Sequence, residues 1–237
     1  MKALLLVLTL TSIQLFSQNN TDIFKQYIET KKNQKEYQVN INYAIYKGMK
    51  GTKAYESYDG VEAKLNDNFY QKLHNTELIM GADFMVKLNP DEKAMLVGYA
   101  SQPVLTNFNQ LDISKVLEFF KEYTVTEKDN YWKVVLTKPN YTLLAQFKII
   151  ELHIEKETLR LQKQIMYYGS LADFAQYEKN KTTKDLDVPR LEITYENYQN
   201  EINLNKNILN SSNYFLYENN TITTAPKYKG YQIIYPN

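Results

Sequence analysis

The sequence predicts a mostly β (α+β) protein: one large, curved antiparallel sheet, or unclosed β-barrel, covered by short α-helices. Long stretches alternate between apolar and polar residues with a period of two, which is typical of half-buried strands. Tyrosine is abundant at 21 of 237 residues, whereas glycine (7) and proline (6) are scarce. This composition favours long, continuous strands. The expected strands follow one another with short connections, so neighbours in sequence should pair.

The first 17 residues have the features of a secretory leader. Lys2 precedes an apolar stretch from Ala3 to Phe16, the pattern of a charged start followed by a short hydrophobic segment. Thr9 and Gln14 interrupt this stretch, and crossing a bilayer takes about 20 apolar residues. We therefore expect cleavage near Ser17, no transmembrane anchor afterwards, and a mature single domain over residues 18–237.

The composition limits which cell compartment and which binding partners we expect for this protein. The chain has no cysteine, so it lacks both disulfides and the thiol that carries the acyl chains of a bacterial lipoprotein. Its 28 basic and 27 acidic residues nearly cancel, whereas nucleic-acid binding calls for a concentrated basic surface. These observations predict a free periplasmic protein that does not bind nucleic acid, and they leave release from the cell open.

The mature chain is expected to begin with a helix and a long strand. Thr21 is a suitable N-cap, and Asp22 follows it in the first turn. The apolar residues after it fall on one helical face: Ile23, Phe24, Tyr27 and Ile28. From Tyr37 to Ile45 the period changes to two, which predicts a half-buried strand.

Three more strands and a turn are expected next. The strands span residues 54–65, 68–74 and 77–88, and in the last of them Leu78, Met80, Ala82, Phe84, Val86 and Leu88 should share one face. The sequence Asn89-Pro90-Asp91-Glu92 predicts a type I turn, because proline fits the second position of that turn. It should lead into a strand over residues 93–100.

A second helix is expected in the middle of the chain. Asp112 is a suitable N-cap, and Ile113, Val116, Leu117 and Phe120 repeat at helical spacing. This helix should end near Tyr123. Together with the first helix it could cover one face of the sheet.

Strands continue through the second half. They are expected over residues 131–137, 145–155 and 159–168, then from Pro189 onward, and finally over residues 231–235. A polar surface loop is expected near residues 178–187. An irregular C-terminal extension should begin at about residue 200, where asparagines are frequent.

This order of elements resembles the LolA/LolB-like outer-membrane lipoprotein carriers. The resemblance covers roughly residues 22–198 and depends on the leader, the N-terminal helix that runs into long strands, the strand–turn–strand from Glu77 to Val97, and the middle helix. It is a likeness of architecture. It implies an unclosed β-barrel of the cell envelope with an apolar cavity that takes acyl chains, and it implies no enzymatic activity.

The sequence offers no catalytic, metal or cofactor site. His74 and His153 are far apart in the sequence, and neither an HExxH nor a CxxC motif occurs. Ser170 follows Gly169 but lacks the G-x-S-x-G pattern of a nucleophile elbow. A hydrolase would need an acid/base pair that the sequence does not indicate.

An acyl ligand, if bound, should lie on the apolar face of the sheet beneath the helices. The candidate contacts are Ile41, Tyr43, Ile45, Met80, Phe84, Val86, Leu96, Phe147, Ile149, Ile165 and Tyr167. Ordinary core packing would explain the same residues, and tyrosine is also a favoured strand residue. Two functions remain open: binding of a lipid or lipoprotein, and docking of an envelope or secretion-complex protein on the same fold.

Overall fold

The structure, a computed structural model, describes residues 20–98, 120–139, 146–178, 183–218 and 221–235. The expected leader lies outside these residues. Helix α2, Asn20–Asn33, is the one α-helix in the described part of the chain. Phe24 and Tyr27 are buried on one side of it, while Lys25 and Gln26 are exposed. The helical spacing in the sequence therefore predicted this element correctly.

The rest of the described chain is mainly strand. The strands are β1 (Glu36–Lys47), β2 (Ala54–Leu65), β3 (Asn68–Leu73), β4 (Thr76–Met80), β5 (Met85–Asn89), β6 (Ala94–Gly98), β7 (Phe120–Glu127), β8 (Tyr131–Pro139), β9 (Phe147–Glu155), β10 (Leu161–Tyr168), β11 (Ala172–Asp173), β12 (Leu186–Asp187), β13 (Pro189–Gln199), β14 (Phe215–Glu218), β15 (Thr221–Thr224) and β16 (Gln232–Ile234).

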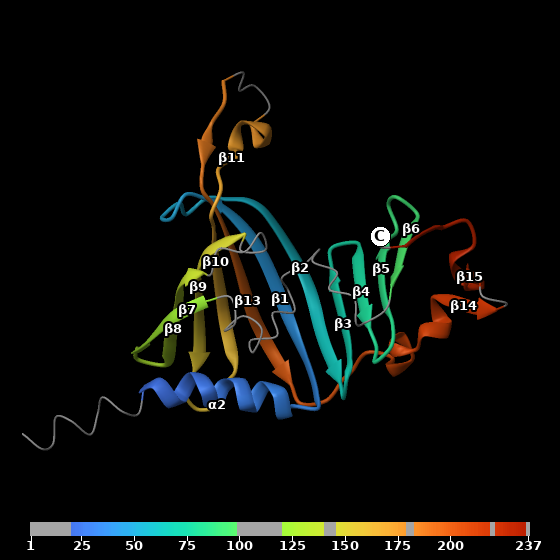
Figure 1. The fold of residues 1–237 in the computed structure, drawn as a ribbon, viewed down its shortest axis with the longest axis horizontal. Helices are drawn as coiled ribbons and strands as arrows, with labels where there is room; N and C mark the ends of the chain where they lie inside the picture. The colour runs from blue at the N-terminus through green and yellow to red at the C-terminus, as the bar shows by residue number, and fades with distance from the viewer. Residues whose placement is uncertain (1–19, 99–119, 140–145, 179–182, 219–220, 236–237) are drawn as a thin grey trace, which may run out of the picture. The chain divides into compact units, whose positions relative to one another are not determined.

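Twelve of these strands form one sheet in the order β16-β6-β5-β4-β3-β2-β1-β13-β10-β9-β8-β7 (Figure 1). Its two outermost strands do not pair with each other, so the sheet is not closed. The mostly β, unclosed architecture expected from the sequence is confirmed. One pairing departs from the expected antiparallel pattern, since β16 runs parallel to β6.

Two compact units share these strands. Unit 1 takes the described parts of Met1–Asn33, Ile45–Tyr55 and Leu111–Ile193, and unit 2 takes those of Gln34–Ala44, Glu56–Gln110 and Thr194–Asn237. Within unit 1, α2 packs on β7, where the rings of Phe24 and Tyr123 meet edge to face at 5.0 Å. Unit 2 contains β3 to β6 and the C-terminal segment.

The expectation of one strand over residues 77–88 is wrong. The chain turns back between β4 and β5, and the N–H of Gly81 donates to the carbonyl oxygen of Phe84 at 2.9 Å. Ile79 then lies opposite Val86. Reversal shifts the side-chain alternation, so Val86 and Leu88 face away from Leu78 and Met80. The signal for this turn was the sequence Gly81-Ala82-Asp83, which contains two turn-forming residue types.

The prediction of a middle helix is wrong for its last residues, which are the part of it that the structure describes. Phe120 to Tyr123 belong to strand β7, and residues 112–119 lie outside the described ones. β7 pairs with β8, with Tyr123 opposite Leu136 and Val125 opposite Val134. The run Tyr123-Thr124-Val125-Thr126 is rich in aromatic and β-branched residues, so strand propensity outweighs the helical spacing of the residues before it.

The turn over residues 89–92 is confirmed as a hairpin connection between β5 and β6. The side-chain oxygen of Asn89 accepts hydrogen bonds from the N–H groups of Asp91 at 3.2 Å and Glu92 at 3.4 Å. The N–H of Lys93 donates to the carbonyl oxygen of Pro90 at 3.2 Å. Asparagine before proline therefore closes this turn with its own side chain.

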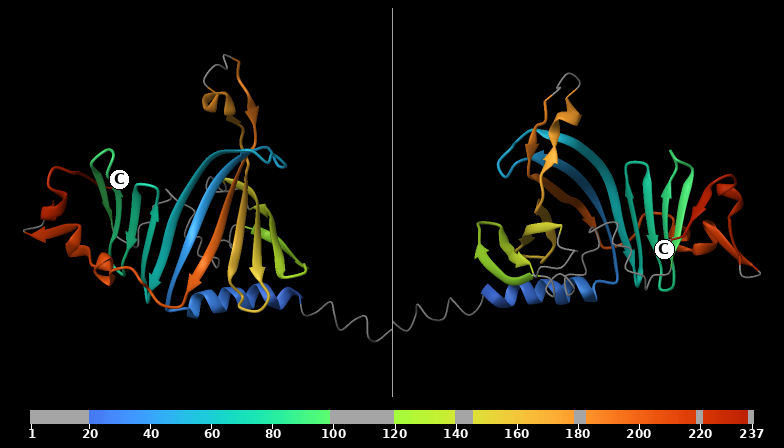
Figure 2. Two further views of the ribbon diagram at one scale, coloured as in Figure 1. Left: turned by 180° about the vertical axis from the view of Figure 1, so that it is seen from behind. Right: turned by 45° about the horizontal axis from the view of Figure 1, so that its top comes forward.

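The C-terminal segment from residue 200 has more structure than its composition indicated. It contains the 3-10 helices η3 (Lys206–Leu209), η4 (Ser211–Asn213) and η5 (Pro226–Tyr228) and the hairpin of β14 and β15. Ile202, Leu209, Tyr214, Ala225 and Tyr228 are buried in one cluster with residues of β2 to β6. Figure 2 shows the segment beside these strands.

Candidate functional site: an apolar sheet face in unit 2

Strands β2 to β6 have two faces, which the strand register defines. In one row across the strands Ala63, Tyr70, Ile79, Val86 and Val97 lie opposite one another in turn. We call the side to which they point the Tyr70 face. A second row contains Lys64, Phe69, Met80, Met85 and Gly98, and a third contains Glu62, Gln71, Leu78, Lys87 and Leu96. These two rows define the opposite side, the Met80 face.

The Tyr70 face is covered by the protein's own C-terminal segment. The cluster there includes Ile79, Val86, Leu88 and Met95 from the strands together with Leu209, Tyr214 and Tyr228 from the segment. Tyr214 stacks on Tyr228 with ring centroids 5.8 Å apart. Burial raises the pKa of both Tyr70 and Tyr214. This face is therefore part of the core of unit 2.

Polar side chains of β1 form hydrogen bonds and an ion pair with the start of the C-terminal segment. The carboxylate of Glu36 accepts from the N–H of Ile202 at 2.9 Å, and Lys206 donates to it at 3.0 Å. The side-chain oxygen of Gln38 accepts from the N–H groups of Asn203 and Leu204. The backbone hydrogen bond from Ile202, followed by the contact with Lys206, lowers the pKa of Glu36. Paired in this way, the carboxylate stays ionised.

The Met80 face carries apolar side chains that remain partly exposed. Phe69 and Leu73 of β3, Met80 of β4 and Leu96 of β6 are each part-exposed. β16 extends the face, because Ile234 lies beside Leu96 in the parallel pairing and is 42% exposed. In the described part of unit 2, the segment that packs on the sheet joins the Tyr70 cluster and not this face.

Four buried polar groups lie at the β1 side of the Met80 face. The Tyr37 hydroxyl donates to Glu62 at 2.5 Å, and Gln71 donates to the Tyr43 hydroxyl at 3.2 Å. Burial, followed by the charge of Glu62, raises the pKa of Tyr43. These contacts also place Tyr37 and Tyr43 on the Met80 face, and Ile41 lies between them in the alternation of β1.

Lys87 places a positive charge among the apolar side chains of this face. Its direct cross-strand neighbours are Leu78 and Leu96. Among the described residues, no carboxylate forms an ion pair with it. Lysine often buries its aliphatic stem along apolar surface and keeps its ammonium group in water. The Met80 face thus combines apolar contact surface with one cation.

The structure divides the eleven residues expected at a ligand site. Ile41, Tyr43, Met80 and Leu96 share the Met80 face. Val86 belongs to the Tyr70 cluster, and Phe84 packs against that cluster, with its ring 6.1 Å from Phe215. The other five candidates lie in unit 1. They are Ile45, which is part-exposed near the end of β1, and Phe147, Ile149, Ile165 and Tyr167.

In unit 1 the face toward α2 is defined by Tyr123, Leu136, Ile150 and Met166, which lie opposite one another in turn. Ile149 and Tyr167 form a pair on the other face, and Ile165 lies there opposite Glu151. Phe147 is buried with its ring 4.7 Å from that of Tyr168. Strand periodicity identified apolar positions correctly, but it could not assign them to faces once turns and bulges intervened.

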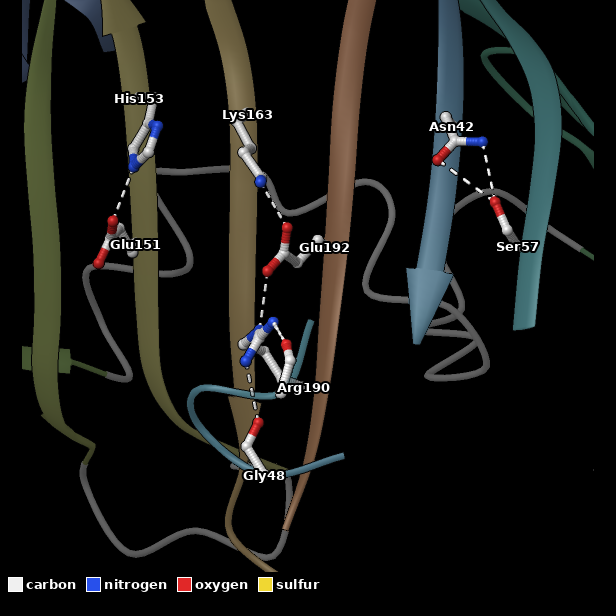
Figure 3. A network of polar contacts seen from close by, with 9 residues as sticks. Asn42, Gly48, Ser57, Glu151, His153, Lys163, Arg190 and Glu192 are labelled. Carbon is white, nitrogen blue, oxygen red and sulfur yellow. Dashed lines mark hydrogen bonds and ion pairs between the residues drawn. The ribbon is translucent and has the colours of Figure 1, made fainter. Parts of the chain in front are cut away.

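The face of unit 1 that carries Glu151 is built from paired charges (Figure 3). Glu151 contacts His153 and Lys133, each at 2.7 Å. Glu192 contacts Lys163, and it accepts from Nε of Arg190 at 2.8 Å. Burial acts to raise the pKa of Glu151, but hydrogen bonds from His153 and Lys133 outweigh it and hold that pKa below its usual value. These carboxylates are neutralised by cations, which suits a structural role.

Neither a metal-binding cluster nor a membrane-spanning helix occurs within the described ranges. No group of three or more histidine, cysteine or acidic side chains there could hold a metal ion. No described helix has the length and apolar character needed to cross a membrane. The Met80 face, with its partly exposed apolar side chains and Lys87, is the candidate site of unit 2.

Comparisons with known proteins give similarities of structure. No known protein family and no curated protein matches the sequence. The solved structures that match include an uncharacterized conserved protein from Thermus thermophilus (11% identity, 92% of this chain and 100% of that chain, TM-score 0.49). They also include a LolA superfamily protein from Nitrosomonas europaea (12%, 78% and 96%, TM-score 0.33) and LprF from Mycobacterium bovis (12%, 76% and 95%, TM-score 0.37).

The LolA superfamily is the group that the order of elements in the sequence resembles. All three TM-scores lie below 0.5 and all three identities are 12% or less. The function is therefore argued from the residues of this chain.

Proposed function

We propose that this protein binds the acyl chain of a lipid or lipoprotein on the Met80 face, as a non-catalytic protein of the bacterial cell envelope. The observation that carries the proposal is the difference between the two faces of unit 2. The Tyr70 face is filled by the C-terminal segment, whereas Phe69, Met80, Leu96 and Ile234 of the Met80 face keep part of their apolar surface exposed.

The dimensions and chemistry of the face suit an acyl chain. Five strands, β2 to β6, lie about 4.8 Å apart, which gives a width of roughly 20 Å. One acyl chain spans about half of a hydrocarbon core that is roughly 30 Å thick. Each methylene that leaves water contributes about 0.8 kcal/mol. Met80 and Met85 can adapt to chains of different shape, because methionine is unbranched and flexible.

Lys87 supports a ligand with an acidic head group. A phosphate or carboxylate next to Leu78 and Leu96 would give its ammonium group an ionic partner while the acyl chain covers the apolar side chains. The expected leader supports export, and we propose the periplasm as the place of action. The absence of a recognisable catalytic motif in the sequence favours binding over chemistry.

Native mass spectrometry of residues 18–237, purified from a bacterial periplasm and followed by lipid extraction, tests the proposal. The parent protein should carry a stoichiometric lipid. Met80→Glu and Leu96→Glu should lose it, because a carboxylate would then face the acyl chain. Tyr217→Glu is the matched control, since Tyr217 is 61% exposed in β14, outside this face. Circular dichroism should show that all variants keep the fold.

The other candidate function is docking of an envelope protein or a secretion-complex subunit. The observation that favours it is the outermost strand β16, where Ile234 is 42% exposed, together with Tyr235 directly after it, which is 53% exposed. An exposed edge strand can pair with a strand of a partner. A lipid-free mass together with no transfer from added vesicles would reject the lipid proposal. Capture of an envelope protein that Ile234→Glu abolishes would then support docking.

A further inference from the structure

Two segments that are distant in sequence meet at one end of unit 1. They are the β1–β2 connection, residues 48–53, and an excursion between β10 and β13, of which the structure describes residues 171–178 and 183–188. Together we call these residues the loop end. The N–H of Gly48 donates to the carbonyl oxygen of Val188 at 2.8 Å. Both views in Figure 2 show the excursion rising from the end at which β1 and β2 connect.

The loop end exposes three large apolar side chains. Met49 is 57% exposed, Leu171 is 61% exposed and Leu186 is 54% exposed. Met49 follows Gly48, which contacts Val188, and Leu186 pairs with Asp173, two residues after Leu171. Seven large apolar side chains are exposed in the described part of the chain, so nearly half of them gather here. Such a group marks an interaction surface more often than a single exposed residue does.

The backbone that carries these three exposed side chains is held by hydrogen bonds and by buried aromatic rings. Arg190 donates to the carbonyl oxygens of Gly48 at 3.0 Å and Gly51 at 2.7 Å. Phe174 is buried against the rings of Tyr55 and Tyr177, at 5.0 and 5.9 Å. The loop end therefore has a small core of its own, and the three apolar side chains remain outside that core.

Three of the four acidic residues in the described loop end are aspartates held by internal contacts, and the fourth, Glu178, is part-buried. Asp173 accepts from the N–H groups of Ala175 at 3.0 Å and Asp185 at 2.9 Å. Asp185 forms an ion pair with Lys47, and Asp187 accepts from the N–H of Val188 at 2.7 Å. These three aspartates are all part-buried.

The exposed charges at the loop end are positive. Lys50, Lys53 and Lys184 are exposed, and the ammonium group of Lys53 lies 5.0 Å from the ring centre of Tyr55. A surface that presents apolar side chains together with lysines complements the interface of a membrane that contains anionic lipids. There the apolar groups can enter the head-group region while the lysines meet phosphates.

We propose that the loop end docks on the surface of a bilayer containing anionic lipid, with Met49, Leu171 and Leu186 entering the head-group region. Lys50, Lys53 and Lys184 supply the attraction to lipid phosphates. This contact is separate from the Met80 face, which belongs to unit 2. It therefore stands whether or not that face carries a lipid.

Co-sedimentation of residues 18–237 with vesicles tests the proposal. The probes are vesicles of pure phosphatidylcholine and vesicles in which about a third of the lipid is phosphatidylglycerol. The parent protein should bind the anionic vesicles, and binding should weaken as salt rises, because salt screens the lysines. Met49→Ser/Leu171→Ser/Leu186→Ser should weaken binding by at least about tenfold. Lys50→Gln/Lys53→Gln/Lys184→Gln should abolish the preference for anionic vesicles.

The matched control is Tyr217→Ser, which removes an exposed aromatic residue outside the loop end and should leave binding unchanged. A second readout follows a single tryptophan. The chain has one, Trp132, so Trp132→Phe/Leu171→Trp places the reporter at the loop end, and its emission should shift to the blue with anionic vesicles. No binding by the parent protein, or equal binding by the triple serine variant, would overturn the proposal. Binding to a protein and not to vesicles would also overturn it.

Discussion

Arg190 Nη1 donates a hydrogen bond of 3.0 Å to the carbonyl oxygen of Gly48, although 142 positions separate the two residues. A second guanidinium nitrogen reaches the carbonyl oxygen of Gly51 at 2.7 Å, and a third donates to Glu192. The guanidinium also lies 4.7 Å from the ring centre of Tyr46. One buried cation therefore holds the β1–β2 connection against β13 within unit 1.

Replacing Arg190 with lysine should destabilise the protein. An ammonium group is a single point and cannot reproduce the planar fork that serves two carbonyl oxygens and a carboxylate. We expect the free energy of unfolding to fall by about 2 kcal/mol or more, since buried acceptors would be left without a donor. Urea denaturation measures this change. Lys32→Arg on the exposed side of α2 is the control, and equal stability of Arg190→Lys and the parent would contradict the assigned role.

Two glycines should respond differently to alanine. A Cβ at Gly60 would lie 2.2 Å from the carbonyl oxygen of Lys72, a backbone atom that cannot move alone. Gly230 has φ +90° but open space around it. We expect Gly230→Ala to cost about 1 kcal/mol from backbone strain, and Gly60→Ala to cost about 3 kcal/mol or more. The order of the two denaturation midpoints is the test, and the reverse order would refute this account of β2.

Stability should fall in alkaline solution because of the Tyr70 face. Burial raises the pKa of Tyr70 and Tyr214 above the ordinary value of 10.0, and nearby Glu77 contributes to both. A group whose pKa is raised in the folded state adds stability that is complete below its unfolded pKa and is lost as pH rises through the folded pKa. The urea midpoint should therefore decline above about pH 10.

Tyr214→Phe should make this alkaline decline shallower, because phenylalanine cannot ionise. The variant also loses the hydrogen bond from Tyr214 to the carbonyl oxygen of Ile208, so the comparison concerns the slope with pH and not the midpoint at neutral pH. Tyr217→Phe is the control, since Tyr217 is largely exposed. An identical slope in Tyr214→Phe and the parent would show that this tyrosine does not contribute.

Local sequence patterns predicted the secondary structure correctly where the apolar residues keep one period between clear turn signals. The spacing of Phe24 and Tyr27 predicted α2, and the alternation from Tyr37 to Tyr43 predicted β1. The expected strand over residues 54–65 has the bounds of β2. The proline turn after Asn89 predicted the β5–β6 hairpin, because its residues satisfy the turn by themselves.

The candidate site could be predicted only in part. Ile41, Tyr43, Met80 and Leu96 were expected together and share one face. Val86 was expected with them, but the turn at Gly81 reverses the chain and places Val86 in the Tyr70 cluster. Lys87 was not expected, since an isolated lysine in a strand normally indicates a solvent-exposed position. Its apolar cross-strand neighbours become evident only from the register.

The sequence by itself determined that this chain is mostly strand, begins with an amphipathic helix, and carries no recognisable catalytic motif. These properties follow from local periodicity and residue type. Only the tertiary structure decided which face each strand presents, that β16 pairs in parallel with β6, and that the asparagine-rich C-terminal segment buries Leu209 and Tyr214 in the core. The physical reason is that strand pairing and burial depend on contacts between residues far apart in sequence, and a shift of one residue exchanges the two faces of a strand.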